Sequence, residues 1–211
     1  MGRIKTIIRH LNFFPYYMKL IFATNNQNKV KEFRSLLGDQ FEIITLLEAG
    51  IDIDIPEPHD TLEANATEKS VTIHRMTREN CFAEDTGLEI AALNGAPGVL
   101  SARYAGEQKE AADNIAKVLR ELEGETNRTA QFRTVISLIL DGKEYQFEGV
   151  SKGHITTAVK GEKGFGYDPV FIPEGETRAF AEMDLSEKNR YSHRARAFEK
   201  FVAFLKQTTN V

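Results

Sequence analysis

The chain has 211 residues, of which 41% are hydrophobic and 27% are charged, a balance typical of a globular protein with a single domain. Its formal net charge of -4 disfavours binding to a nucleic acid polymer, because proteins that bind one usually present a basic face. No apolar run approaches the roughly 18 residues of a membrane span, and the single cysteine, Cys81, allows no internal disulfide and suits a reducing cytoplasm.

The first 17 residues do not follow the pattern of the rest of the chain. They begin with basic residues, but Arg9 and His10 interrupt any apolar segment of the kind found in signal peptides. Regular apolar periodicity starts only after them. We therefore expect residues 1–17 to form a peripheral extension and residues 18–211 to form one domain.

Apolar periodicity predicts alternating strands and helices along the chain. Short apolar runs predict strands, in chain order, over residues 19–24, 41–46, 81–93, 128–140 and 143–159. Helical spacing predicts helices, in chain order, around residues 30–37 with a stop at Gly38, over 60–76, and around 115–122 and 195–205. The pair Asp141-Gly142 predicts a two-residue hairpin loop. The sequence therefore predicts an α/β domain with a mixed sheet and a long central hairpin.

The turn after the first predicted strand is unusually rich in amide side chains. In chain order it consists of Thr24, Asn25, Asn26, Gln27, Asn28 and Lys29. Backbone N–H groups at a helix start attract anions, and Lys29 adds a full positive charge, so the turn could form a phosphate cradle without a Walker motif. For the turn alone a second interpretation stays open, in which Asn and Thr simply cap the helix.

Acidic residues follow two of the predicted elements. Glu84 and Asp85 are expected at the end of a strand, before a Thr-Gly turn, and Glu57 lies in a Pro-flanked loop. Mg²⁺ typically binds one or two carboxylates together with phosphate oxygens and waters. Glu57 and Asp85 form the best candidate pair, because both are expected on loops. The alternative for each residue is a solvated surface charge.

The segment GFGYDP offers a surface for a nucleotide base. Gly164 and Gly166 would let a ligand approach the backbone closely, and Phe165 and Tyr167 offer flat faces for stacking. Asp168 precedes a proline, which favours an extended conformation. Loops of glycine and aromatic residues also form ordinary structural corners, so this segment alone is a weak signal.

Three basic side chains, Lys188, His193 and Arg194, are expected at the start of the final helix. Lys and Arg side chains only donate hydrogen bonds. Donors at the six-position of a purine would pair with a keto oxygen and repel an amino group. The alternative is a basic helix face without a ligand.

Together, these segments resemble the inosine triphosphate pyrophosphatase family, the XTP/dITP diphosphatases that hydrolyse non-standard purine nucleoside triphosphates. The resemblance runs from Met18 to about Leu205 and rests on FATNNQNKVKEF, GAPGVLSARYAG, GFGYDP and SHRARA in the family's order. It implies a two-lobed α/β fold, with an elongated mixed sheet flanked by helices and an active cleft between the lobes. It also implies a cytoplasmic homodimer that removes ITP, dITP and XTP from the nucleotide pool with Mg²⁺ as cofactor.

The resemblance also implies roles for individual residues. The triphosphate would bind at residues 24–29, and Asp85 would bind Mg²⁺ and act as the base, with Glu57 as the second metal ligand. Lys69 is implicated in catalysis and Thr86 in nucleotide contact. Base recognition falls on Phe165, Gly166, Tyr167, Asp168, Lys188, His193 and Arg194. Glu84 stands where many bacterial members carry a second aspartate.

Two rival interpretations remain. One is a Maf-like pyrophosphatase that acts on other nucleotides, against which the SHR segment speaks. The other is a non-catalytic module that senses nucleotides or binds RNA, which release of pyrophosphate in the presence of Mg²⁺ would exclude.

Overall fold

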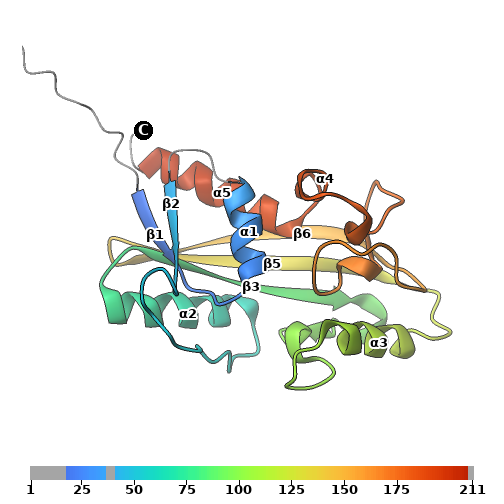
Figure 1. Cartoon of the computed structure of the whole chain (residues 1–211). Coiled ribbons are helices and arrows are strands. Elements are labelled where there is room, and N and C mark those ends of the chain that lie inside the picture. Colours follow the sequence, from blue (N-terminus) through green and yellow to red (C-terminus); the bar gives the residue numbers. More distant parts are fainter. Residues whose placement is uncertain (1–17, 37–40, 209–211) are drawn as a thin grey trace, which may run out of the picture.

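A mixed seven-stranded sheet, flanked by helices on both faces, organises the computed structural model, which describes residues 18–36 and 41–208 (Figure 1). The strands are β1 (Met18–Phe22), β2 (Phe41–Thr45), β3 (Cys81–Ile90), β4 (Pro97–Gly98), β5 (Thr129–Leu140), β6 (Lys143–Ile155) and β7 (Phe171–Pro173). The helices are α1 (Gln27–Leu36), α2 (Leu62–Thr77), α3 (Ala111–Glu121), α4 (Leu185–Asn189) and α5 (His193–Thr208). None of the helices in these residues is long and apolar enough to span a membrane.

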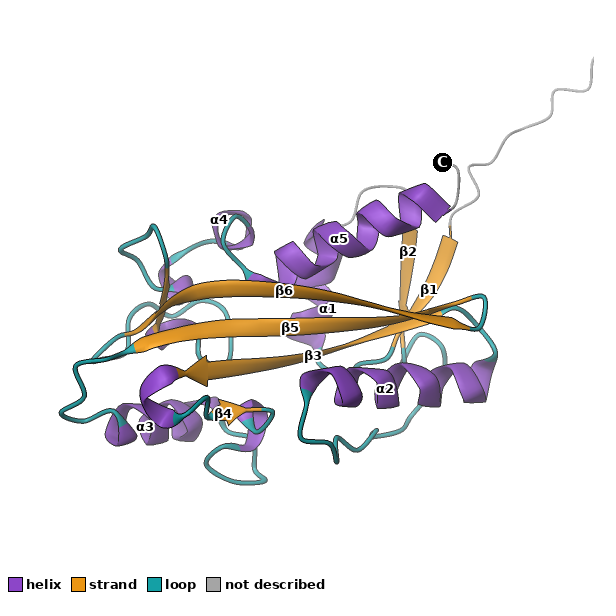
Figure 2. Ribbon diagram, turned by 180° about the vertical axis from the view of Figure 1, so that it is seen from behind, coloured by secondary structure: helices purple, strands orange, loops and turns teal. Residues whose placement is uncertain are grey.

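The strand order is β2-β1-β3-β5-β6-β7, with β4 beside β3. The two pairings of β1 are parallel and the others are antiparallel, so the predicted mixed sheet is confirmed. Helices α1 and α5 cover one face, whereas α2 and α3 lie under opposite ends of the other (Figure 2). The predicted extension, residues 1–17, and the predicted helix stop, Gly38, lie outside the described residues.

Two sequence predictions of local structure were wrong. Thr86 and Gly87 do not form a turn, because both lie within β3 and pair with Thr134 and Arg133 of β5. Lys188 does not start the final helix but lies in the separate short helix α4. The pairing of β3 with the long hairpin overrides the local turn signal, since a continuous ladder satisfies every backbone group along that edge.

The predicted hairpin at Asp141-Gly142 is confirmed. Both residues have positive φ, 50° and 77°, as a two-residue turn that matches the twist of the strands requires. The ladder between β5 and β6 runs from Leu140 opposite Lys143 to Thr129 opposite His154. The two strands of this long hairpin therefore extend from one end of the molecule to the other.

One edge of β3 is open at its middle. On that side β1 pairs only with Cys81 and Phe82, and β4 pairs only with Leu88 and Glu89. Residues 83–87 thus have no strand neighbour there in the described part of the chain, although β5 pairs with them on the other side. This gap divides the fold into two lobes joined by the long strands.

Each lobe has its own apolar core. On the α1 and α5 side, Phe22 stacks on Phe82 with ring centroids 4.3 Å apart and meets the edge of Phe33 at 4.7 Å. In the other lobe, Phe132 meets the edge of Phe171 at 4.7 Å. Burying such a ring stabilises the folded state by roughly 1.5–3 kcal/mol. The two cores hold the lobes rigid on either side of the gap.

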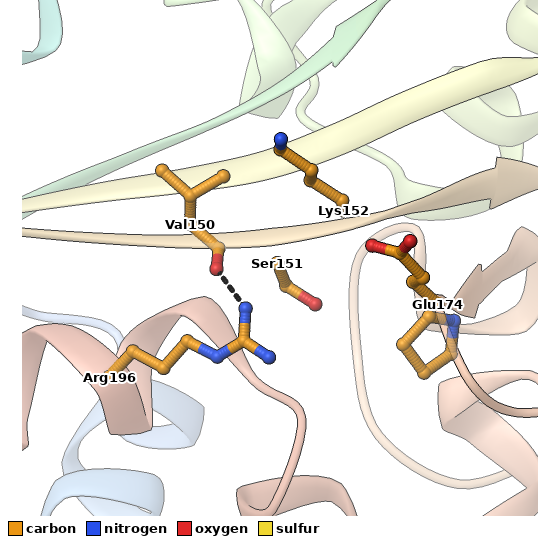
Figure 3. Close-up of a pocket in the computed structure, with 6 residues that line it drawn as sticks. Val150, Ser151, Lys152, Glu174 and Arg196 are labelled. Atoms are coloured by element: carbon orange, nitrogen blue, oxygen red, sulfur yellow. Dashed lines mark hydrogen bonds between the residues drawn. The ribbon is translucent and has the colours of Figure 1, made fainter.

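Helix α5 is held against β6 by a close backbone contact at Gly149 and by hydrogen bonds from the side chains of Arg196 and Lys200. A Cβ at Gly149 would lie 2.1 Å from the carbonyl oxygen of His193, so the close approach requires glycine. Arg196 donates to the carbonyl of Val150 at 2.5 Å, and Lys200 donates to a neighbouring carbonyl of β6 at 2.7 Å (Figure 3). Beyond the short strand β7, these bonds occupy carbonyls on the otherwise open edge of β6.

A cavity of about 300 Å³ lies where β7 ends, between β6, Glu174 and Arg196 (Figure 3). Ser151 is buried in its wall, and its hydroxyl has no hydrogen-bonding partner among the residues described. Ser151 therefore fills space between β6 and α5 but makes no side-chain hydrogen bond that holds the helix there.

We expect Gly149→Ala to destabilise the protein by about 1–3 kcal/mol, because the added methyl group collides with the backbone of α5. Ser151→Ala serves as the matched control on the same face of β6. It should leave stability unchanged or slightly raised, since it removes a buried hydroxyl that lacks a partner. Urea unfolding measures both effects, and equal stabilities for the two variants would show that α5 does not depend on close contact with β6.

Candidate active site

The pleat of β3 sends neighbouring side chains to opposite faces at the open edge. Glu84 contacts Lys29 of α1 and Arg194 of α5, whereas Asp85 contacts Lys69 of α2. Asp85 was therefore wrongly expected on a loop, since it lies in the middle of a strand. The two adjacent carboxylates therefore belong to two halves of the site: Glu84 to the half beside α1 and α5, and Asp85 to the half beside α2.

The α2 half gathers two carboxylates around one ammonium group. Lys69 Nζ lies 2.5 Å from Glu57 Oε1 and 2.8 Å from Asp85 Oδ1. Burial raises the pKa of Asp85 to about 6, against the opposing charge of Lys69. Burial acts in the same direction on Glu57, but there the charges of Lys69 and Lys29 outweigh it and lower the pKa to about 2. Asp85 is thus the more basic carboxylate of the pair.

These residues fit a hard divalent cation. The oxygens of Glu57 and Asp85 already converge on one cationic group, and Mg²⁺ prefers such oxygen donors, usually one or two carboxylates completed by phosphate and water. A cluster of three or more His, Cys, Asp or Glu ligands is not found within residues 18–36 and 41–208.

The amide-rich turn caps α1, which is one of the two interpretations left open by the sequence. Asn26 caps α1, because its side chain accepts from the N–H groups of Asn28 and Lys29 at 3.0 and 3.2 Å. Thr24 accepts from the Asn26 N–H at 3.2 Å, and Asn25 donates to the Ile53 carbonyl at 2.9 Å. The cap thereby orients the start of α1.

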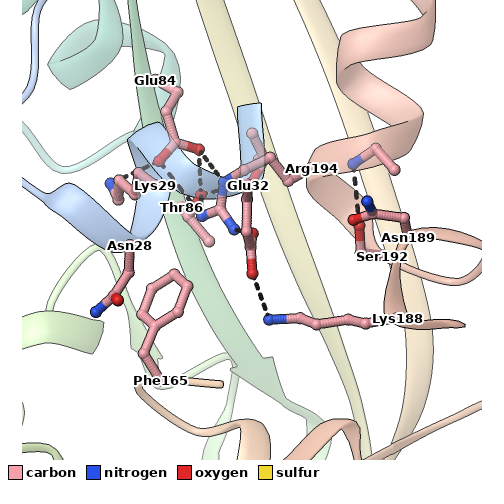
Figure 4. Close-up of polar contacts among 12 residues, drawn as sticks. Asn28, Lys29, Glu32, Glu84, Thr86, Phe165, Lys188, Asn189, Ser192 and Arg194 are labelled. Carbon is pink, nitrogen blue, oxygen red and sulfur yellow. Dashed lines mark hydrogen bonds and ion pairs between the residues drawn. The ribbon is translucent and has the colours of Figure 1, made fainter. Parts of the chain in front are cut away.

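Only part of the turn faces the cleft. Asn26, Asn28 and Lys29 line a cavity of about 360 Å³, whereas Gln27, the first residue of α1, does not. Lys29 Nζ also lies 2.7 Å from Glu84 Oε1, a contact drawn in Figure 4. The turn therefore supplies a capped helix start and one cation to the cleft.

A row of six alternating charges leads from the turn to the predicted base-recognition segments, and Figure 4 labels all of its members except Asp168. We call it the charge row, and its members, in spatial order, are Lys29, Glu84, Arg194, Glu32, Lys188 and Asp168. Burial would raise the pKa of Glu84, but Arg194 and Lys29 hold it well below its usual range. Burial raises the pKa of Asp168 despite its contact with Lys188. The row is electrically neutral when all six groups are ionised.

Lys188 is held by two carboxylates. Its Nζ lies 2.7 Å from Glu32 Oε1 and 2.6 Å from Asp168 Oδ2, so two of its three N–H groups are engaged. The same nitrogen lies 5.0 Å from the centre of the Phe165 ring. One N–H of Lys188 thus remains for a ligand stacked beside Phe165.

Arg194 is fully buried and nearly saturated. Its Nε and Nη2 lie 3.2 and 3.3 Å from the Glu84 carboxylate, and Nη1 contacts Glu32. Nη2 also approaches Thr86 Oγ1 at 3.4 Å. Of its five N–H groups, these contacts leave one. The expected free donors therefore exist, but each is held in place by acceptors that the sequence did not reveal.

His193 packs in the same wall. Its ring stacks on Phe132 with centroids 4.6 Å apart, and burial together with the charge of Arg194 keeps its pKa well below the ordinary value. Its Nδ1 has no hydrogen-bonding partner among the described residues. A neutral His193 therefore forms an apolar wall with one unsatisfied polar atom.

The structure brings most of the predicted base-recognition residues into the same cavity, and adds others. In chain order, the predicted lining residues are Thr86, Phe165, Gly166, Tyr167, Asp168, Lys188, His193 and Arg194. Lining residues that sequence reasoning missed include Ser101, Lys109 and Asn114, and Glu32 was also missed as the anchor of Lys188. Glu32 follows Lys29 by three positions, so helical spacing was the one signal that places both on the same side of α1.

Comparisons with known proteins agree over nearly the whole chain. A family model described as the Ham1 family matches residues 20–204. A dITP/XTP pyrophosphatase of Flavobacterium johnsoniae is 49% identical over 90% of this chain and 100% of the relative. A dITP/XTP pyrophosphatase of Porphyromonas gingivalis is 51% identical over 89% of this chain and 97% of the relative. The structure of the Staphylococcus aureus Ham1 protein matches with a TM-score of 0.82 at 38% identity, covering 90% of this chain and 99% of that chain.

The buried carboxylate of Asp85 should cost stability at neutral pH. Its pKa is about 6 in the folded protein against an ordinary 3.8, so its contribution to stability is present below pH 3.8 and is lost as pH rises through about 6. We therefore expect metal-free Asp85→Asn to melt at the same or a higher temperature than the unchanged protein at neutral pH. The difference should shrink as the pH falls from 6 towards 3.8.

Glu84→Gln is the matched control, because the pKa of Glu84 is lowered from its ordinary 4.5. Its contribution has the opposite sign, so this variant should melt lower at neutral pH, and the deficit should shrink as the pH falls below 4.5. Calorimetry across this range measures both variants. A lower melting temperature for Asp85→Asn at neutral pH would contradict the conclusion that the buried charge of Asp85 lowers the stability of the fold.

Proposed function

The chain belongs to the Ham1 family, and we propose that it hydrolyses the non-standard purine nucleoside triphosphates ITP, dITP and XTP to the monophosphate and pyrophosphate. One observation carries the proposal: the open edge of β3 lies next to the capped start of α1 with Lys29, the carboxylates of Glu57 and Asp85, and a cavity wall with Phe165, Lys188 and Arg194. By the same resemblance we propose a homodimer that acts on the nucleotide pool in the cytoplasm.

Glu57 and Asp85 would hold the metal ion on the α2 side of the cleft. When bound, Mg²⁺ would neutralise the triphosphate and make the α-phosphorus more electrophilic. Asp85, whose pKa is about 6, is basic enough to take a proton from an attacking water and acidic enough to be ionised at neutral pH. Lys69 keeps both carboxylates oriented and limits their mutual repulsion.

The helix start would receive the departing pyrophosphate. Lys29 has three N–H groups, and its contact with Glu84 occupies one of them. The other two, together with the positive end of the α1 helix dipole, can stabilise the negative charge that develops as the bond to the α-phosphorus breaks. Asn28 lies beside Lys29 in the cleft and can add amide donors.

The charge row would read the base. Lys188 and Arg194 each keep one donor for a six-keto oxygen, and the carboxylate of Asp168 lies beside Lys188 as an acceptor for a neighbouring ring N–H. ATP carries an amino group and an unprotonated ring nitrogen in these places, so it would set donor against donor and acceptor against acceptor. Each unpaired buried group costs about 1–3 kcal/mol. GTP shares the keto oxygen, so another contact must refuse its two-amino group.

A pyrophosphate-release panel tests the proposed function. ITP, dITP and XTP should be hydrolysed far faster than ATP, GTP, CTP and UTP, and only when Mg²⁺ is present. Asp85→Asn should lower the turnover of ITP by at least about 10², the low end of the contribution of a general base. Absence of pyrophosphate from all of these substrates would rule out the proposal, and a preference for pyrimidine nucleotides would assign the cleft to another class of substrate.

We expect Arg194→Lys to narrow the preference for ITP over ATP in kcat/KM by about tenfold or more. Lysine keeps the charge but has only three donors, so it cannot satisfy Glu84 and Glu32 in the same geometry and still reach a keto oxygen. The ratio of ITP to GTP should change less, because both bases carry that oxygen.

Arg196→Lys, two positions along α5, is the control, since Arg196 contacts the edge of β6 and not the charge row. Melting curves establish that both variants are folded before the kinetics are compared. An ITP/ATP ratio that stays unchanged in Arg194→Lys would mean that Arg194 does not read the base.

A further inference from the structure

Arg103 bridges the two sides of the cleft. It ends a short 3₁₀ helix, Ser101–Arg103, in the segment between β4 and α3. Its Nη2 donates to the backbone carbonyl of Glu57 at 3.1 Å, and its Nη1 lies 3.5 Å from Glu57 Oε2. These contacts join residues 46 positions apart in the sequence, one from each side of the gap in the sheet.

The segment that carries Arg103 is firmly anchored. Ser101 Oγ accepts from the Leu88 N–H at 2.8 Å, and the Ser101 carbonyl accepts from the Tyr167 hydroxyl at 2.9 Å. Asn114 of α3 donates to the carbonyl of Ala102 at 3.0 Å. The backbone of Arg103 is therefore fixed by β3, by the base-recognition loop and by α3.

The segment that carries Glu57 is held on either side of that residue, where Asn25 donates to the Ile53 carbonyl at 2.9 Å and the Asn65 side chain accepts from the His59 N–H at 2.9 Å. Residues 46–61, between β2 and α2, contain no helix or strand. The Glu57 side chain is 27% exposed, whereas those of Lys69 and Asp85 are each 8% exposed. Lys69 holds one of its carboxylate oxygens at 2.5 Å, so contacts from Arg103 supply the hold on its backbone and on its other oxygen.

We propose that Arg103 is a positioning residue that holds Glu57 where it can serve as a metal ligand. This inference rests on the proposed function, which assigns Glu57 and Asp85 to the metal. Arg103 itself does not touch the metal or the substrate in this role. It joins a loop without helix or strand in one lobe to an anchored segment of the other, and so holds the second carboxylate in the site.

Loss of the positive charge of Arg103 and loss of its hold on Glu57 would change the affinity for a divalent cation in opposite directions. Arg103 is a cation close to a carboxylate, so its removal should on Coulombic grounds attract a divalent cation more strongly. If position dominates, removal should weaken binding, because Glu57 must then be ordered when the metal binds. Loss of a group that orients a metal ligand typically costs about 10- to 100-fold in affinity. The sign of the change therefore separates the two effects.

The test measures Mn²⁺ binding to the full chain, with the metal alone as probe, by electron paramagnetic resonance of the free ion. We expect Arg103→Ala and Arg103→Lys both to bind Mn²⁺ about tenfold more weakly. The lysine variant keeps the charge but loses the planar group that reaches the carbonyl and the carboxylate together. Arg120→Ala is the control, because Arg120 is exposed on α3 in the same lobe and no contact joins it to Glu57 among the described residues.

Glu57→Gln shows whether Arg103 acts through Glu57. In that background, Arg103→Lys should cause little further loss of Mn²⁺ affinity. In turnover of ITP, Arg103→Lys should raise the Mg²⁺ concentration needed for half-maximal rate while kcat at saturating Mg²⁺ stays close to that of the unchanged protein. Melting curves identify any variant whose loss of Mn²⁺ affinity reflects unfolding. If Arg103→Ala is unfolded, the comparison uses Arg103→Lys.

Unchanged or tighter Mn²⁺ binding in the Arg103 variants would overturn the inference, as would an equal loss in the Glu57→Gln background. Failure of the proposed function gives a different result. A protein whose Mn²⁺ affinity depends on Arg103 and Glu57 but which releases no pyrophosphate from ITP would keep the positioning role and lose the activity. A protein that hydrolyses ITP with Arg103 variants that bind Mn²⁺ normally would keep the activity and lose the positioning role.

Discussion

The site depends on one constraint, the unpaired edge of β3 over residues 83–87. A strand must send successive side chains to opposite faces, and an edge without a neighbour leaves room for a ligand to pass from one face to the other. Glu84 and Asp85 can therefore be adjacent in sequence and still serve two separate sets of contacts. The pairing with β5 keeps the strand straight and the two sets in fixed register.

The charge row shows how a protein can bury several charged side chains in a fixed arrangement without a large loss of stability. Single buried charges are costly, but each group in the row lies beside a partner of opposite sign, and Lys188 and Arg194 are each held by carboxylates on both sides. A ligand therefore meets donors that are already oriented and already desolvated. Selectivity in such a site comes from the few donors and acceptors that the row leaves unpaired.

Sequence patterns predicted the elements of regular structure well, because periodicity and turn chemistry are local. The hairpin at Asp141-Gly142 was readable from two residues, and helices α1, α2, α3 and α5 from their apolar spacing, whereas the short helix α4 was not predicted. The Thr-Gly turn was predicted wrongly, since pairing with β5 decides that stretch and depends on residues far along the chain. The contacts of Glu32 and of Arg103 were beyond reach for the same reason: they join distant segments and leave no periodic signal.

The long hairpin also sets an order for the assembly of the fold. A two-residue loop brings β5 and β6 together at little entropic cost, and the ladder can then extend pair by pair from the turn. The pairing of Ile21 with Cys81 must instead close a long stretch of chain and so comes slowly. Nucleation would thus begin on the hairpin, and the lobe that carries the amide-rich turn would join it late.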